Sequence, residues 1–275
     1  MKKFLVPTDF SDTSKNAAAY AVQMAADVKD GEIILINVSD KITGGSDGTP
    51  LVETTNDRRA ILNQALSHMK EDLLKLAKVP ISCVIEEGSS LVETLGRYVR
   101  HHGIDLVIMG ITGATRLEQI FMGSNTLDLV NEEECPVMIV PPDASYKKVK
   151  NVMLTSDFKN VGTTIPVAPI TATLNLFKPA VHIVNVDSEH YVEITDEYKA
   201  ERNKLEEMLK GFSPEFYFIR QYDFLEAVSQ FAHDKEIDLI ITVPKDHSLL
   251  SNIFSTSHTK KLAYHSHVPI VAIHE

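Results

Sequence analysis

The sequence predicts an α/β protein in which two similar copies each form a five-stranded, mainly parallel sheet flanked by helices. Three observations lead to this fold class. Short apolar runs rich in β-branched residues alternate with helical patterns along the chain, as they do in α/β proteins. These runs are continuously apolar, which is typical of strands buried on both faces. The whole alternation then occurs a second time, and 275 residues of which 44% are hydrophobic suffice for two cores.

Three blocks in the same order carry the internal repeat. Residues 3–10 match 151–158 at a shift of 148 residues, and Asn37-Val38 matches Asn185-Val186 at the same shift. Residues 103–108 match 236–241 at a shift of 133 residues. We therefore expect one domain over residues 1–145 and a second over residues 146–275. They are joined near Pro141-Pro142, because paired prolines continue neither a helix nor a strand ladder.

Five strands are expected in the first copy, at residues 4–6, 33–38, 81–85, 106–109 and 137–140. A helix over residues 14–28 is predicted to end before Gly31, and a later one to end at Gly103. The first has an apolar stripe at spacings of three and four residues, formed by Ala17, Tyr20, Ala21, Met24 and Val28. Before the third strand lies a second stripe, formed by Leu62, Ala65, Met69, Leu73 and Leu76. The polar, glycine-rich residues 43–50 predict a loop.

Charge and cysteine content exclude several classes of protein. Lys and Arg total 27 against 38 Asp and Glu, a net charge of −11. An acidic chain without a basic tract binds neither nucleic acid nor anionic membranes well, and no apolar run approaches the roughly 20 residues of a membrane helix. Cys83 and Cys135 lack CxxC spacing, so we expect a reducing, cytoplasmic environment. Pro7 ends the apolar start after three residues, which argues against a signal peptide.

Ligands of an open parallel sheet bind beyond the carboxyl ends of its strands. This singles out Pro7-Thr8-Asp9, the stretch after Val38, Gly88 and the loop that starts at Gly110. Asp9 has two interpretations at such a position. Its carboxylate can accept hydrogen bonds from ribose hydroxyls or from an adenine amino group. Alternatively it caps the helix over residues 14–28, which is worth about 1 kcal/mol, and the two roles are compatible.

The most specific motif in the sequence is Gly110-x2-Gly113-x9-Gly123-Ser124. Gly113 would close a tight turn and let the backbone approach a ligand, and Ser124 is a good N-cap for a helix through about Glu132. The N–H groups of that helix's first turn would form a nest for phosphate oxygens. The sequence has neither a Walker lysine after Gly123 nor a GxGxxG fingerprint. A purely structural role of these glycines in tight turns is the alternative.

With these motifs the chain resembles the universal stress protein family in its tandem, two-domain form. The resemblance rests on residues 6–11, on Asn37-Val38, on the glycine loop and on residues 136–140. It implies Rossmann-like domains of the adenine nucleotide alpha hydrolase-like type, and the glycine pattern is similar to that of the family's ATP-binding branch. The ATP-binding residues that it implies are Pro7, Thr8, Asp9, Val38, Met109, Gly110, Thr112, Gly113, Ala114, Thr115, Arg116, Gly123, Ser124, Asn125 and Thr126.

The resemblance also implies a division of labour among these residues. Asp9 and Val38 would hold the adenosine, and the loop from Gly110 together with Ser124 would wrap the ribose and the phosphates. Arg116 is the only cation in the glycine loop of a copy with an excess of acidic residues. Backbone N–H groups, the helix dipole and a divalent ion must then attract the phosphates. We therefore expect ATP together with Mg²⁺ as the cofactor.

The second copy keeps Asp157, Val186 and Ser257 but replaces the three loop glycines by Val243, Asp246 and Thr256. A carboxylate in a phosphate site repels the ligand, so we expect this copy not to hold ATP in the same way. His265-x-His267 with a further histidine could bind zinc, although a polar turn is the simpler interpretation. We therefore predict no metal site. The histidines near the altered loop and the last helix are His247, His258, His265 and His267.

We expect a nucleotide-dependent regulatory protein of the stress response and no catalytic residues. The glycine loop region holds Thr112, Thr115 and Glu118 but no His, Cys or paired carboxylates, which catalysis of phosphoryl transfer would use. A slow ATPase or nucleotidyl-transfer enzyme and a nucleotide-free scaffold are the alternatives. The apolar last strands, 137–140 and 270–273, would lie at sheet edges. By the resemblance they pair within the chain as a pseudo-twofold dimer, and a further homodimer stays open.

Overall fold

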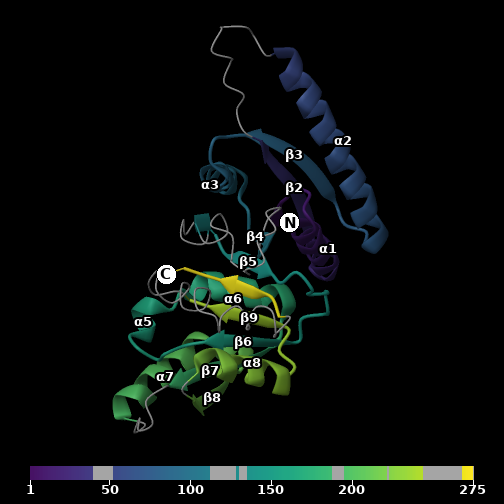
Figure 1. Ribbon diagram of the computed structural model, residues 1–275. Helices are drawn as coiled ribbons and strands as arrows, with labels where there is room; N and C mark the ends of the chain where they lie inside the picture. The colour runs from purple at the N-terminus through teal and green to yellow at the C-terminus, as the bar shows by residue number, and fades with distance from the viewer. Residues whose placement is uncertain are drawn as a thin grey trace.

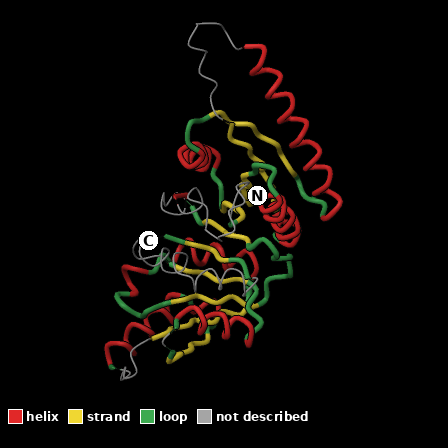
Figure 2. Tube along the Cα trace, viewed as in Figure 1, coloured by secondary structure: helices red, strands yellow, loops and turns green. Residues whose placement is uncertain are grey.

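The computed structural model describes residues 1–39, 52–111, 128–129, 135–187, 195–221, 223–243 and 268–274. Within these residues, the strands form one long sheet with helices against both of its faces (Figure 1). Figure 2 shows the strands following one another from the top of the molecule to the bottom. The predicted α/β fold class with a mainly parallel sheet is confirmed.

The elements alternate along the chain as the sequence predicts. The first half contains β1 (Lys2–Pro7), α1 (Asp12–Asp27), β2 (Gly31–Ser39), α2 (Val52–Leu76), β3 (Ile81–Glu87), α3 (Leu91–His102), β4 (Leu106–Gly110) and β5 (Val137–Val140). The second half contains β6 (Asn151–Thr155), α5 (Val161–Thr164), α6 (Val167–Phe177), β7 (Ala180–Asp187), α7 (Asp196–Met208), β8 (Glu215–Arg220), α8 (Phe224–Asp234), β9 (Leu239–Thr242) and β10 (Ile270–Ala272). All five strands expected in the first copy are present.

The strand order is β3-β2-β1-β4-β5-β10-β9-β6-β7-β8. Neighbouring strands run parallel at every position except between β5 and β10, where Met138 lies opposite Val271 in an antiparallel pair. Since residues 138 and 271 are equivalent in the repeat, a local pseudo-twofold axis passes between them. The predicted pairing of the two last strands is confirmed, and it joins two five-stranded sheets into one.

Two hydrophobic clusters form the core, one on each face of the sheet. Phe4 and Val6 belong to one cluster, and Leu5 between them belongs to the other, as expected for a strand whose side chains alternate between faces. The first cluster contains residues of α1, α2, α6 and α7, and the second contains residues of α3 and α8. Each cluster draws on both halves of the chain, so the junction between β5 and β10 is part of a continuous core.

Three details of the helices differ from the sequence prediction. The stripe of α1 is buried as expected, but α1 ends at Asp27, and Gly31 begins β2 instead of ending the helix. A Cβ atom at Gly31 would lie 2.6 Å from the carbonyl oxygen of Ala25, so this glycine serves close packing. In α2, Leu76 is 52% exposed, whereas Leu66, outside the expected stripe, is fully buried. The expected stop at Gly103 is confirmed, with φ of 61° at the C-cap.

Residues 141–150 between β5 and β6 are fastened to α1. The side-chain amide of Asn16 donates hydrogen bonds to the carbonyls of Pro141 and Ala144, at 2.9 and 3.2 Å. The hydroxyl of Tyr146 donates to the carboxylate of Asp27 at 2.7 Å. The expected linker is therefore an ordered strap on the first half, although the predicted boundary at residue 145 itself stays a prediction. The expected loop at residues 43–50 lies outside the described residues.

Candidate functional site

The strand order places a topological switch point between β1 and β4, where α/β proteins commonly have a ligand-binding crevice. From β1 the chain crosses to β2 on one side, and from β3 it crosses back to β4 on the other side of β1. Where successive connections leave in opposite directions, the carboxyl ends of the two strands frame an opening that α/β proteins use for ligands. Leu5 pairs with Val107, so the ends of β1 and β4 lie at the same edge. The structure thus brings Pro7-Thr8-Asp9 and Met109-Gly110 together.

Thr8 is held by hydrogen bonds in the backbone turn that borders this crevice. Its amide donates to the carbonyl of Ile36 at 2.9 Å, and its hydroxyl accepts from the amide of Phe10 at 3.0 Å. The hydroxyl also shares a hydrogen bond with the Ser14 hydroxyl at 3.0 Å. Phe10 has a φ of 63°, in the left-handed region that non-glycine residues rarely adopt. Pro7 and Thr8 are both buried, so they shape the turn and hold the next residue in place.

That next residue, Asp9, is exposed at the mouth of the crevice. Its Oδ1 accepts from the backbone amide of Ser11 at 3.0 Å and from the Ser11 hydroxyl at 2.5 Å. The alternative interpretation, that Asp9 caps the helix, is wrong, since α1 begins at Asp12 and Ser11 is its N-cap, accepting from the amide of Ser14. Asp9 instead orients the capping serine, because its short side chain reaches the amide and the hydroxyl of the residue two positions on.

Asn37 is a positioning residue whose role the sequence analysis missed. It lies in β2 with 8% of its surface exposed, and its side-chain amide donates to the carbonyl of Thr8 at 2.8 Å. This bond satisfies the carbonyl at the point where β1 turns, and a buried carbonyl without a partner would be costly. The available signal was an amide in an otherwise apolar strand, repeated 148 residues later. Val38, the next residue, is half-buried beside it.

The end of β4 packs directly on the first turn of α1. A Cβ atom at Gly110 would lie 2.8 Å from the carbonyl oxygen of Thr13, closer than side-chain carbons approach in proteins. Gly110 pairs with Val140 of β5 as the last residue of β4, and Met109 before it is buried. This glycine is therefore required by the packing of β4 against α1. Its role in approaching a ligand stays a prediction.

The remaining expected site residues lie outside the part of the chain that the structure describes. They are Thr112, Gly113, Ala114, Thr115, Arg116, Gly123, Ser124, Asn125 and Thr126. Of the expected helix through Glu132, Asp128 and Leu129 are described, and both are helical. The four histidines of interest in the second half are likewise outside the described residues. Within those residues, no group of three His, Cys, Asp or Glu side chains could hold a metal ion.

The second half repeats the turn after its first strand. The hydroxyl of Ser156 accepts from the amide of Phe158 at 3.2 Å, and Asp157 accepts from the amide of Lys159 at 3.0 Å. Asn185 donates to the carbonyl of Ser156 at 2.9 Å, as Asn37 does to Thr8. Phe158 also has a left-handed backbone, with φ of 52°. The frame of the crevice is thus present twice.

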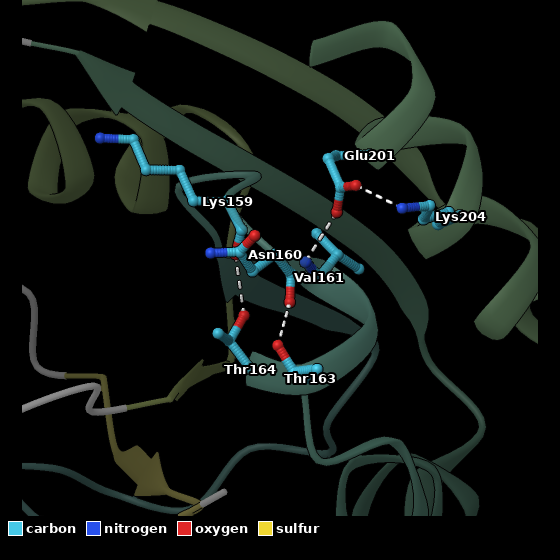
Figure 3. Close-up of polar contacts among 7 residues, drawn as sticks. All are labelled: Lys159, Asn160, Val161, Thr163, Thr164, Glu201 and Lys204. Carbon is cyan, nitrogen blue, oxygen red and sulfur yellow. Dashed lines mark hydrogen bonds and ion pairs between the residues drawn. The ribbon is translucent and has the colours of Figure 1, made fainter. Parts of the chain in front are cut away.

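Beyond this turn the two halves diverge. In place of one long helix like α1, the second half has the four-residue α5, which is followed by Pro166 and α6. Figure 3 shows Glu201 of α7 reaching the amide of Val161, the first residue of α5, at 2.7 Å. Glu201 is also paired with Lys204. Both contacts lower the pKa of its carboxyl group, and the hydrogen bond from Lys204 has the larger effect. A carboxylate of the chain itself therefore lies at the start of α5.

Known proteins resemble the chain in sequence and in fold. The sequence model of the universal stress protein family matches residues 1–141. A universal stress protein of Methanocaldococcus jannaschii is 30% identical over 147 residues, which are 50% of this chain and 81% of that protein. A second one from the same organism is 27% identical over 154 residues, 50% of this chain and 94% of that protein.

The fold comparison extends over nearly the whole chain. The crystal structure of a universal stress protein from Archaeoglobus fulgidus DSM 4304 superimposes with a TM-score of 0.70 at 17% identity, covering 99% of this chain and 98% of that one. At this identity the likeness concerns the fold, and it agrees with the ten-stranded arrangement seen here. The family match itself covers the half that contains the crevice between β1 and β4. The chain belongs to the universal stress protein family.

Proposed function

We propose that the first half of the chain binds ATP with Mg²⁺ in the crevice between β1 and β4, and that the protein acts as a nucleotide-dependent regulator in the stress response. The observation that carries the proposal is the exposed carboxylate of Asp9, fixed at the topological switch point by its bonds to Ser11. A carboxylate held in this way is pre-organised to accept hydrogen bonds from ribose hydroxyls. The glycine loop after Gly110 would supply amides to the phosphates.

The same reasoning assigns no nucleotide to the second half. The turn with Asp157 and the brace from Asn185 are retained there, but the loop glycines are replaced in the sequence. The amide at the start of α5 is already bound by the carboxylate of Glu201, which is itself paired with Lys204. Since phosphates and carboxylates repel each other, we assign the second half a structural role as the partner of the first half in the sheet.

We further propose binding without evolved turnover, in the cytoplasm. Hydrolysis would use a base placed beside the phosphates, and the sequence of the glycine loop region contains no His, Cys or paired carboxylates. Both cysteines are free thiols, which suits a reducing compartment.

Mass spectrometry of the small molecules released when the purified protein is denatured tests this function. Unhydrolysed ATP, in an amount close to that of the protein chain, is the expected result. Rapid conversion of added ATP to ADP would favour an ATPase instead. Protein that neither carries nor binds a nucleotide would contradict the proposal and favour a scaffold.

The matched variants Asp9→Ala and Asp157→Ala locate the site. Loss of a charge-assisted hydrogen bond at Asp9 should weaken ATP binding by about 10- to 100-fold, and the equivalent change at Asp157 should leave it unchanged. Asp9→Asn separates the two roles of Asp9, because the asparagine oxygen can still accept from the amide of Ser11.

A further inference from the structure

A second opening lies away from the crevice, between the strap of residues 141–150 and α8. It is a groove of about 1030 Å³, and its other lining residues come from the amino ends of β6, β9 and β10. None of the residues that line it belongs to the expected nucleotide site. We call it the linker groove. Its volume is in the range of sites that bind small organic ligands.

One wall of the linker groove is held rigidly. The bonds from Asn16 to Pro141 and Ala144, and from Tyr146 to Asp27, fix the strap on α1. The opposite wall is one face of α8, since the lining residues Glu226, Ser229, Gln230 and His233 follow helical spacing. Fixed walls lower the entropy cost of binding.

Tyr20 of α1 is a largely buried residue that lines this groove. Its side chain lines the groove although the residue is only 3% exposed, and its ring packs edge-on against Tyr146 at 5.3 Å. Among the described residues, this hydroxyl has no hydrogen-bond partner. Burial, and then the charge of Asp238, raise the pKa of Tyr20, so the phenol remains a donor. A phenol at the wall of a groove offers a hydrogen-bond donor to a ligand that binds there.

The charged side chains of the groove are divided between its walls. Lys147, Lys148 and Lys150 of the strap line it, and none of them forms an ion pair within the described parts of the chain. Glu226 of α8 and Glu236 after it line the other wall, and their carboxylates also have no partner there. Within the described lining, the unpaired cations are thus the three strap lysines and the unpaired anions are the two glutamates of the other wall.

Three further charged or titratable groups at the groove are already engaged. Asp143 of the strap lines the groove beside the lysines and is not free. Asp238 accepts from the amides of Lys150 and Asn151 at 2.8 and 3.0 Å, and so holds the start of β6. His233 lies 3.5 Å from the carboxylate of Asp234. The strap lysines and the two glutamates therefore remain available to pair with the charges of a ligand.

We propose that the linker groove binds a small zwitterion, namely an amino acid or short peptide with both termini charged. Its carboxylate lies toward the strap lysines and its ammonium group toward Glu226 and Glu236. A carbonyl or carboxylate oxygen accepts the hydrogen bond of the Tyr20 hydroxyl. A ligand that is only cationic or only anionic would pair with the charged side chains of one wall and leave those of the other wall without a partner. This proposal does not depend on nucleotide binding.

Titration of the isotope-labelled full chain with triglycine, followed by NMR at millimolar probe concentrations, tests the proposal. Triglycine should shift amide resonances of the strap and of α8. N-acetyl-triglycine, which lacks the ammonium group, and triglycine amide, which lacks the carboxylate, should each bind more weakly by about two- to five-fold. Equal binding of the three probes, or no shifts with triglycine, would overturn the proposal.

Variants assign the contacts. Lys148→Gln should weaken triglycine but not triglycine amide, and Glu226→Gln should weaken triglycine but not the acetylated probe. Tyr20→Phe should weaken triglycine by roughly 3- to 10-fold with an unchanged thermal midpoint, because its hydroxyl has no partner among the described residues. Lys75→Gln, on the exposed side of α2, is the matched control. Loss of binding in this control equal to that in Lys148→Gln would also overturn the assignment.

Discussion

The side-chain amide of Asn37 donates to the carbonyl of Thr8 at 2.8 Å, and Asn185 makes the same bond to Ser156 at 2.9 Å. Each bond ties the second strand of a half to the point where its first strand ends. The frame of the crevice therefore exists in both halves, and the difference between them begins after this turn. Such a duplicated frame allows the same substitution to be compared in two settings within one chain.

Asn37→Ala should lower the free energy of unfolding by about 1–3 kcal/mol, because it leaves the buried carbonyl of Thr8 without a partner. The same substitution should weaken ATP binding, since Asp9 follows directly on Thr8. Asn185→Ala is the matched control, with a similar loss of stability and unchanged ATP affinity. Urea unfolding and calorimetry measure the two quantities. Equal loss of ATP affinity in both variants would contradict the assignment of the site to the first half.

Gly110→Ala should destabilise the protein by about 1–3 kcal/mol, because the added Cβ would be 2.8 Å from the carbonyl oxygen of Thr13. Gly162→Ala in α5 is the control, since a Cβ there meets nothing within 4 Å. That change should be neutral or stabilising by roughly 0.5–1 kcal/mol. Thermal unfolding of the two variants checks this, and equal stability of Gly110→Ala and the unmodified chain would show that β4 and α1 are less closely packed.

His182 should make the stability depend on pH. The residue is 7% exposed and packs between Tyr217 and Phe231, and neither ring nitrogen has a hydrogen-bond partner among the described residues. Burial lowers its pKa, Glu215 at 4.0 Å opposes this, and Lys235 adds to it. The unfolded chain therefore binds a proton at this histidine more readily than the folded chain. The free energy of unfolding is highest above the ordinary histidine pKa of about 6.5 and decreases as the pH falls below it.

Urea unfolding between neutral and mildly acidic pH measures this dependence. His182→Leu should reduce the loss of stability on acidification, whereas His233→Gln, at an exposed position, should not. An unchanged acid dependence in His182→Leu would exclude this histidine as its source.

The strand pair β5–β10 predicts the behaviour of the first half alone. A protein of residues 1–145 would expose the edge of β5, which the full chain covers with β10, and unpaired edges associate. We expect this fragment to form a homodimer in which Met138 lies opposite its own copy. Sedimentation equilibrium measures the mass, with the full chain as control. A monomeric fragment would contradict the prediction.

The fold was predictable from the sequence because parallel strands and amphipathic helices leave local patterns. Part of the candidate site was predictable, because ligands of a parallel sheet bind beyond the carboxyl ends of its strands. That β1 lies beside β4 came from the structure. Gly31 and Leu76 were wrongly interpreted, because the approach of Ala25 and the exposed end of α2 depend on tertiary packing. Contacts such as that of Asn16 with Pro141 join residues 125 positions apart. No local sequence pattern predicts such a contact.

Isothermal titration of the full chain with ATP in the presence of Mg²⁺ tests the central claim most directly. The account predicts one nucleotide bound per chain and an affinity that falls when Mg²⁺ is removed. It also predicts binding that is about 10- to 100-fold weaker in Asp9→Ala and unchanged in Asp157→Ala. Two nucleotides per chain, or binding that survives Asp9→Ala and disappears in Asp157→Ala, would contradict it.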